Sequence, residues 1–339
     1  MREPAFWWEE SAAIAARLLA PVAMLYGSIA QMRLNRRGRR AAAPVICIGN
    51  LTVGGAGKTP MALAAARMLR DAGEQPIFLT RGYGGKLAGP VLVEPKRHLA
   101  ADVGDEPLLL AHAAPTVVAR GRVAGARSAI AAGATVIVMD DGFQNPALRK
   151  DFSLLVLDER RGIGNGRVIP AGPLRVPIAA QLARAHALVA VGTSSRGAEV
   201  TAQARKRNLP VYRACLAPDR DFIAALGAGR VLAFAGIGNP DKFFATLSDA
   251  GISVAATRSF PDHHRYTQAQ AQALCEQAED DGLVLVTTEK DLVRMRGDDN
   301  VVELAAHVHA LPVALVLEEE EAFKAFLLQR LAAAKASRR

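Results

Sequence analysis

The clearest chemical motif in this chain is a glycine-rich loop that ends in Gly-Lys-Thr. The segment GNLTVGGAGKTP occupies residues 49–60, between a short apolar run and an alanine-rich stretch. A strand, such a loop and a helix together form the phosphate-binding loop of nucleotide-using enzymes, whose backbone amides surround the phosphates. Lys58 is expected to reach the β- and γ-phosphates of ATP, and Thr59 to place its hydroxyl on Mg²⁺. The predicted ATP-binding residues are Thr52, Val53, Gly54, Gly55, Ala56, Gly57, Lys58 and Thr59.

One position of this loop departs from the usual pattern. The strict motif opens with a glycine, and Thr52 stands in that place, while the final Gly-Lys-Thr is intact. Gly54 and Gly55 still allow positive φ and a close approach of backbone N–H groups to phosphate oxygens. A chance glycine-rich turn is the alternative interpretation, and the strand–loop–helix context argues against it.

Two aspartates follow a second apolar run. Residues 136–139 read VIVM and lead directly into Asp140 and Asp141. A buried strand that ends in a carboxylate is where phosphate-loop enzymes hold Mg²⁺. Adjacent aspartates repel each other unless a cation offsets their charge. Taken alone, the pair is more typical of a solvated turn, but with the phosphate-binding loop upstream it predicts the magnesium site.

Two further polar groups have a less specific pattern. Asp105 and Glu106 open an apolar stretch, where helix capping explains acidic residues as well as chemistry does. His263 and His264 follow Pro261-Asp262 in an expected loop. No cysteine or suitably spaced acid accompanies these histidines, so they do not indicate a zinc site. Neither segment defines a catalytic role by itself.

The N-terminal segment combines an apolar stripe with a basic end. Residues 12–32 carry one charge, Arg17, and five arginines follow, at positions 33, 36, 37, 39 and 40. The flank before the stripe is acidic, which disfavours a signal peptide. A transmembrane span and a core-facing helix remain alternatives, but a helix lying on a membrane with anionic headgroups explains more of the pattern. The large apolar side chains, spaced by three or four, are Ile14, Leu18, Val22, Leu25, Ile29 and Met32.

The composition limits the classes of protein and partner. Half of the 339 residues are hydrophobic, and the formal charge is +9, which indicates a globular protein with an anionic partner. Three scattered cysteines offer neither a disulfide framework nor a zinc site. The arginines gather beside an apolar helix and no RNA-binding or zinc-finger motif accompanies them, so we expect no nucleic-acid partner. No pattern defines the oligomeric state.

From residue 44 onward, short apolar strands alternate with helical stretches. This order predicts an α/β fold with a mostly parallel sheet like that of phosphate-loop nucleotide hydrolases. We expect three parts: a membrane-associated helix and basic segment at 1–40, a kinase domain at 41–225, and a smaller α/β domain at 226–339 that includes the last helix. A glycine-rich linker is expected at 226–230, one continuous strand at 311–317, and a ligand-binding cleft between the domains.

Several blocks together resemble the tetraacyldisaccharide 4′-kinases of lipid A biosynthesis, in an order and spacing that cover nearly the whole chain. Beyond the N-terminal helix and the phosphate-binding loop, they are LTRGYGG (79–85), GDEP (104–107), DDGFQ (140–144), IPAGPLR (169–175), FAGIGNP (234–240), FPDHH (260–264) and TTEKD (287–291). Thr52 in the loop is also usual in this family.

The resemblance implies phosphorylation, dependent on ATP and Mg²⁺, of the 4′-hydroxyl of a tetraacylated glucosamine disaccharide 1-phosphate, on the cytoplasmic face of the bacterial inner membrane. It also implies that Asp105 acts as the base, paired with His263, and that domain closure assembles this site with Lys58. The implied acids around the metal are Glu106, Asp140 and Asp141, with Thr59. The implied substrate contacts are Arg81, Gln144, Asn145 and Arg175.

Two positions depart from the family pattern. Asn145 follows DDGFQ, where the family usually has histidine, and Val176 follows PLR, where it usually has glutamate. Asparagine still forms hydrogen bonds but carries no charge, and valine does neither. These changes affect local contacts and leave the expected reaction class unaltered.

One rival function shares the central motifs. A phosphate-loop ATPase that docks on membranes and regulates a partner would have the same loop and acidic strand. Such a switch needs neither an Asp–His pair across a cleft nor a site for an acceptor sugar. ATP consumption without phosphorylated lipid would distinguish it from a lipid kinase.

Overall fold

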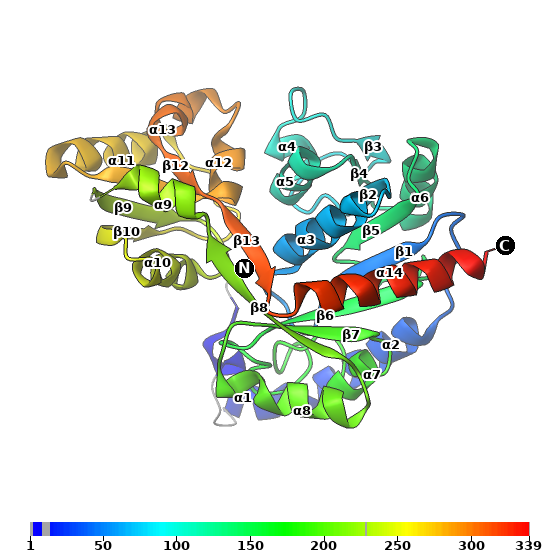
Figure 1. Ribbon diagram of the computed structural model, residues 1–339. Coiled ribbons are helices and arrows are strands. Elements are labelled where there is room, and N and C mark those ends of the chain that lie inside the picture. The colour runs from blue at the N-terminus through cyan, green and yellow to red at the C-terminus, as the bar shows by residue number, and fades with distance from the viewer. Residues whose placement is uncertain (1–2, 9–13, 228, 339) are drawn as a thin grey trace.

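The chain folds around two β-sheets, one large and one small, in a computed structural model that describes residues 3–8, 14–227 and 229–338 (Figure 1). The large sheet has nine strands in the order β13-β8-β7-β6-β1-β5-β2-β4-β3. Adjacent strands of this sheet are parallel except at its two edges, where β3 is antiparallel to β4 and β13 is antiparallel to β8. The strands are β1 (Val45–Asn50), β2 (Pro76–Thr80), β3 (Val91–Leu92), β4 (Thr116–Val118), β5 (Val136–Asp140), β6 (Phe152–Asp158), β7 (Ala187–Val191), β8 (Val211–Pro218) and β13 (Val313–Leu317).

Helices cover both faces of this sheet, as its continuous apolar strands require. Within β1, Ile46 and Ile48 contribute to the core under α3 and α14, while Val45 and Cys47 contribute to the core under α6, α7 and α8. The helices and short 3₁₀ turns of this part are η1 (Ala5–Trp7), α1 (Ile14–Leu18), α2 (Ala20–Asn35), α3 (Lys58–Asp71), α4 (Ala100–Val103), α5 (Asp105–Ala113), α6 (Arg122–Ala131), α7 (Ile178–Leu182), η2 (Ser195–Gly197), α8 (Ala198–Lys206) and α14 (Glu320–Ala336).

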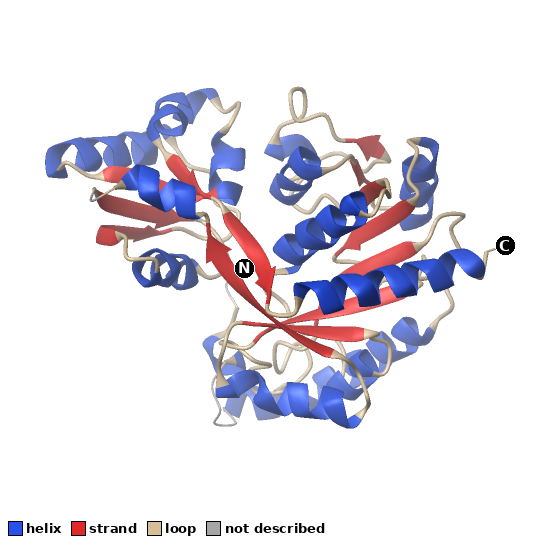
Figure 2. Ribbon diagram, viewed as in Figure 1, coloured by secondary structure: helices blue, strands red, loops and turns tan. Residues whose placement is uncertain are grey.

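The small sheet forms a second α/β domain, with parallel strands in the order β10-β9-β11-β12 (Figure 2). Two apolar clusters lie on its two faces and share no buried residue with those of the large sheet. Its elements are α9 (Arg220–Leu226), β9 (Arg230–Ala235), α10 (Pro240–Asp249), β10 (Ser253–Ser259), α11 (Gln268–Asp281), β11 (Val284–Thr288), α12 (Glu289–Met295), η3 (Asp299–Val301), α13 (Val302–His307) and β12 (His309–Leu311).

The C-terminal segment differs from the expectation. The expected strand at 311–317 is two strands, because β12 ends in the small sheet at Leu311 and β13 begins in the large sheet at Val313. The last helix, α14, therefore belongs to the first domain and not to the domain expected at 226–339. Its residues Phe323, Leu327 and Leu331, spaced by four, are buried in the core of the large sheet.

The expected linker at 226–230 is also wrong. Leu226 is the last residue of α9 and Arg230 the first of β9, and both elements contribute side chains to one apolar cluster of the second domain. The two domains are instead connected by β8 and β13, and all of β13 pairs with residues 214–218 of β8. Figure 1 shows these two strands reaching from the large sheet toward the small one.

The N-terminal helices turn their large apolar side chains away from the protein. Small residues, among them Ala16, Ala23 and Gly27, are buried against the first domain. Ile14 and Leu18 are 77% and 75% exposed, and the other members of the expected stripe, Val22, Leu25, Ile29 and Met32, are 45–65% exposed. The large apolar side chains of the expected stripe are therefore exposed within the described part of the chain. Part of the expected helix, residues 12 and 13, lies outside the described residues.

No helix in the described ranges combines the length and the apolar character that crossing a membrane requires.

The assignment of α14 to the first domain is testable through Phe323, which is fully buried and packs edge-on against Tyr212 with ring centroids 5.0 Å apart. Phe323→Ala should lower the free energy of unfolding by about 3–5 kcal/mol, because it leaves a cavity in the core of the large sheet. Chemical denaturation followed by circular dichroism measures the change. The control Gln329→Ala, on the exposed face of the same helix, should stay within about 0.5 kcal/mol of the parent. A loss below about 1 kcal/mol for Phe323→Ala would contradict this packing.

Candidate active site

The glycine-rich loop joins β1 to α3 at the carboxyl edge of the large sheet, where β1 lies between β5 and β6. Gly54 and Gly57 have φ of 90° and 91°, a region that favours glycine. Gly57 directly precedes the first residue of α3, Lys58. The first turn of α3 therefore presents its unpaired N–H groups and its positive dipole end at the loop, as an anion site requires.

The first half of the loop is held by the IPAGPLR segment. Thr52 forms an isolated antiparallel bridge with Leu174, and the Val53 amide donates to the Pro173 carbonyl at 2.9 Å. The Arg175 Nε donates to the Thr52 carbonyl at 3.1 Å. Thr52 therefore occupies a bridged, buried position rather than a free turn, which explains why a glycine is not needed there.

Thr59 and Asp140 form the part of the site that fits a divalent cation. The Thr59 hydroxyl lies 3.3 Å from Asp140 Oδ2, and both residues are buried. The other carboxylate oxygen, Asp140 Oδ1, is buried and has no hydrogen-bond partner. Burial, together with the nearby charge of Glu106, raises the pKa of Asp140 to about 7. A cation would satisfy the lone oxygen and offset the cost of the buried charge.

The described part of the chain contains no group of three or more His, Cys, Asp or Glu side chains arranged around a common metal position. Mg²⁺ in phosphate-loop sites is held by one or two protein groups together with phosphates and water. The pairing of Thr59 with Asp140 therefore fits Mg²⁺ bound with a nucleotide.

Asp141 is paired with an arginine. Its two oxygens accept hydrogen bonds from Arg175 Nη1 at 2.7 Å and Nη2 at 3.2 Å. Burial alone would raise the pKa of Asp141, but the charges of Lys58 and Arg175 hold it below its usual range. Arg175, expected from the resemblance to contact the substrate, is thus fixed between the phosphate-binding loop and this carboxylate.

The other expected substrate residues have varied surroundings. Gln144 donates to the Asn50 carbonyl at 3.0 Å and to Gln181 Oε1 at 3.1 Å, so the protein holds its amide. Asn145 Oδ1 accepts the Ala147 amide at 2.9 Å and closes a turn. Arg81 is exposed just after β2 at the carboxyl edge.

Val176, the second departure from the family pattern, is buried in the core beneath the large sheet. A glutamate there would place a charge among apolar side chains as this chain packs them, so the valine fits its local surroundings.

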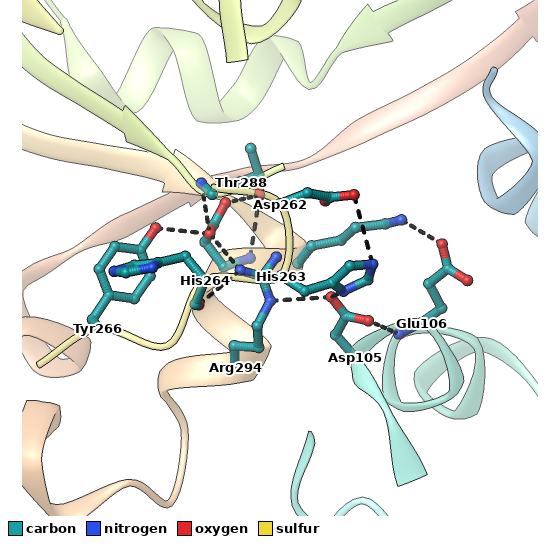
Figure 3. A network of polar contacts seen from close by, with 11 residues as sticks. Asp105, Glu106, Asp262, His263, His264, Tyr266, Thr288 and Arg294 are labelled. Atoms are coloured by element: carbon teal, nitrogen blue, oxygen red, sulfur yellow. Dashed lines mark hydrogen bonds and ion pairs between the residues drawn. The ribbon is translucent and has the colours of Figure 1, made fainter. Parts of the chain in front are cut away.

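The structure brings Asp105 and His263 together across the domain boundary (Figure 3). His263 Nδ1 lies 3.1 Å from Asp105 Oδ2, although 158 residues separate them in sequence. Asp105 begins α5 in the first domain and is 3% exposed, while His263 lies in the loop after β10. His263 has a φ of 56°, which a non-glycine residue adopts only where its surroundings hold it.

Cations surround this acidic residue and its neighbour. Burial would raise the pKa of Asp105, but its hydrogen bond to His263 and the charges of Lys290, His263 and Arg294 hold it well below its usual range. The same hydrogen bond raises the pKa of His263. Asp105 is therefore ionised at neutral pH.

Glu106 connects the pair to the phosphate-binding loop. Lys290 Nζ, from α12 of the second domain, lies 2.6 Å from Glu106 Oε1. The charges of Lys290 and of Lys58 both lower the pKa of Glu106. Glu106, expected from the resemblance among the metal acids, thus forms an interdomain ion pair within the electrostatic reach of Lys58.

The sequence does not identify three residues of this site, Lys290, Asp291 and Arg294. Arg294 Nε lies 3.1 Å from Asp105 Oδ2, and Arg294 Nη1 lies 3.0 Å from Asp291 Oδ1. The TTEKD block contained Lys290 and Asp291, but no role was inferred for them. If residues 289–295 are assigned to a helix, Lys290 and Arg294 lie on one face, since they are four residues apart.

A cavity of about 360 Å³ lies beside the Asp105–His263 pair. Residues of both domains line it, including Tyr83 and Gly104 from the first and Arg265 and Arg296 from the second. The Tyr83 ring packs against the His263 ring with centroids 5.2 Å apart. The interdomain cleft expected from the sequence is therefore present, with an ionised carboxylate and a histidine at its wall.

Known proteins resemble this chain over almost its full length. The model of the family described as tetraacyldisaccharide-1-P 4′-kinase, LpxK, matches residues 15–332. The tetraacyldisaccharide 4′-kinase of Methylobacterium nodulans is 55% identical over 333 residues, covering 98% of this chain and 96% of the relative. That of Nitrobacter winogradskyi is 53% identical over 332 residues and covers 98% of both chains.

A solved structure shows the same architecture. The crystal structure of LpxK from Aquifex aeolicus, described as an "apo" form in complex with ATP, has a TM-score of 0.71 and 28% sequence identity, and covers 94% of this chain and 99% of that one. The sequence and structural similarities extend through both domains. The chain therefore belongs to the tetraacyldisaccharide-1-P 4′-kinase family.

Proposed function

We propose that this protein transfers the γ-phosphoryl group of ATP to the 4′-hydroxyl of a tetraacylated glucosamine disaccharide 1-phosphate, a lipid A precursor. The family membership and the names of its relatives support the reaction. The observation that carries the proposal in this chain is the contact between Asp105 and His263, which joins the two domains beside a phosphate-binding loop. An ATPase switch has no need of such a pair.

The geometry suggests a role for each residue. Asp105 is held ionised, so its carboxylate is available to accept the proton of the attacking sugar hydroxyl. His263 orients that carboxylate through Nδ1. Lys58 and the loop amides stabilise the charge that develops on the transferred phosphoryl group. Tyr83 and the cavity beside the pair provide room for part of the acceptor.

Thr59 and Asp140 are the residues that would hold Mg²⁺. The lone buried oxygen of Asp140 and the adjacent hydroxyl suit its preference for oxygen ligands. When bound, the ion neutralises charge on the phosphate oxygens. Asp141 already pairs with Arg175, and Glu106 with Lys290, so we assign both acids to electrostatic support of the site.

The same proposal places the protein on the cytoplasmic face of the inner membrane. Large apolar side chains on α1 and α2 face outward, and the basic segment 33–40 follows them. An exposed apolar face next to arginines is suited to insertion among anionic headgroups, because burial of the side chains and charge attraction act together. Such docking would bring the site to a substrate whose acyl chains stay in the bilayer.

Lys58→Ala should lower kcat for lipid phosphorylation by about 10²–10³-fold, because it removes a charge that stabilises the transition state. The assay follows transfer of ³²P from γ-labelled ATP to the tetraacyldisaccharide 1-phosphate by thin-layer chromatography. Lys86→Ala, at an exposed lysine, is the matched control. Near-normal turnover by Lys58→Ala would remove the loop from the mechanism, and ATP hydrolysis without labelled lipid in the parent would favour the ATPase switch.

Asp105→Asn should lower kcat by about 10²–10⁴-fold and change the KM for ATP only slightly, because the amide keeps the shape of the carboxylate but is no base. Asp102→Asn, three residues away, is the control, since the Asp102 side chain accepts the Leu99 amide from the first turn of α4 and an asparagine oxygen can accept the same bond. A kcat within threefold of the parent would exclude Asp105 as the base.

Leu18→Glu combined with Leu25→Glu should release the protein from vesicles that contain anionic phospholipid, because both exposed side chains would then place charge in the apolar region of the bilayer. Co-sedimentation measures the bound fraction. The control pair Ala325→Glu and Gln329→Glu adds the same charge to exposed positions of α14. Equal binding by the two double variants would show that another surface docks.

A further inference from the structure

One face of α12 makes the contacts of this helix with the first domain. Lys290, Val293 and Arg294 share that face because they are three and four residues apart. Lys290 pairs with Glu106, and Arg294 Nε lies 3.1 Å from Asp105 Oδ2. Val293, 5% exposed, packs into an apolar cluster with first-domain side chains. The buried first-domain members of that cluster are Val93, Val103, Leu108 and Val118.

Arg294 contacts Asp105 directly and, through a backbone carbonyl, the residue that follows His263. Its Nε shares Asp105 Oδ2 with His263, and its Nη1 donates to the carbonyl of His264 at 3.1 Å (Figure 3). Arg294 thus restrains the carboxylate and also the loop that holds His263 at positive φ. Its side chain is only 7% exposed, so these contacts are shielded from water.

Arg294 is in turn held by a fully buried aspartate. Asp291 Oδ1 accepts Arg294 Nη1 at 3.0 Å, the Tyr266 hydroxyl at 2.7 Å and the Gly236 amide at 3.0 Å. The second oxygen of Asp291 accepts the Thr288 hydroxyl at 2.5 Å. Gly236 directly follows β9, Thr288 ends β11 and Tyr266 lies in the loop after β10, so the guanidinium is fixed to the frame of the second domain.

We propose that Arg294 is a positioning residue that aligns Asp105 with His263 when α12 docks on the first domain. The inference rests on the kinase function proposed above. When this face of α12 contacts the first domain, the rigid guanidinium of Arg294 donates both to Asp105 and to the loop that carries His263. The Asp105–His263 pair is therefore aligned only while the two domains are in contact. A lysine at this position could donate to Asp105 or to the His264 carbonyl, but it lacks the planar fork that reaches both.

Kinetic comparison of three variants tests the proposal: Arg294→Met, Arg294→Lys and the control Arg258→Met. Arg258 is exposed, and its hydrogen bonds stay within the second domain, to Thr257 and Gln277. Arg294→Met should lower kcat for lipid phosphorylation by about 10²-fold with the KM for ATP nearly unchanged, because misplacement of a reacting group costs rate and not nucleotide binding. Arg294→Lys should recover part of the loss, and Arg258→Met should equal the parent.

Repeating the substitution in an enzyme that already carries His263→Ala distinguishes a positioning role of Arg294 from a general effect on stability. If Arg294 acts through the pair, Arg294→Met in a His263→Ala enzyme should cost less than about threefold, since the alignment it maintains is already lost. The same fold loss in both backgrounds, or a kcat for Arg294→Met within twofold of Arg258→Met, would overturn the proposal. Should Arg294→Met fail to fold, as circular dichroism would show, Arg294→Lys in the two backgrounds gives the same comparison.

A measurement that does not depend on activity distinguishes this inference from the kinase function. In NMR spectra of protein with ¹³C-labelled histidine, the His263 ring signal is assigned by its absence from His263→Ala. That signal should shift in Arg294→Met and stay in place in Arg258→Met. An unmoved signal in Arg294→Met would overturn the positioning role. A parent protein that makes no phosphorylated lipid would contradict the proposed function alone.

Discussion

The organisation of the site depends on one carboxylate oxygen, Asp105 Oδ2, which a histidine and an arginine of the other domain share. His263 and Arg294 both lie 3.1 Å from it, and a buried carboxylate is stable only with such partners. The second domain therefore supplies the charge that Asp105 needs, and the first domain supplies the acid that His263 needs. Neither domain contains the Asp105–His263 pair by itself.

The large sheet explains why the phosphate-binding loop and Asp140 meet. β1 and β5 are parallel neighbours, so Lys58 and Thr59, just beyond the end of β1, lie beside the end of β5. Ligands of open α/β sheets bind at this carboxyl edge, where loops converge. α5 begins with Asp105 and Glu106, and Lys58 is near enough to lower the pKa of Glu106. Nucleotide chemistry and proton transfer are thus placed side by side by strand order.

The sequence predicted the motifs whose residues are contiguous, and it did not predict contacts between residues that are far apart in the chain. Lys58, Thr59 and the strand before Asp140 were recognisable because each pattern is contiguous. The pairing of Asp105 with His263 came from the family resemblance, since neither short segment distinguishes a catalytic group from a cap or a surface loop. The pairing of Arg175, an expected substrate contact, with Asp141 became visible only in the folded arrangement of charges.

The connection through β8 and β13 has a consequence for how the molecule forms during synthesis. The second domain is inserted between these paired strands, so the ribosome releases all of it before β13 and α14. Until then β8 is an open sheet edge, and the apolar surface that Phe323, Leu327 and Leu331 later cover faces water. The nascent chain thus passes through a stage that exposes an unpaired strand edge and an apolar surface. At that stage, chaperone binding or pairing of β8 with a wrong strand competes with completion of the fold.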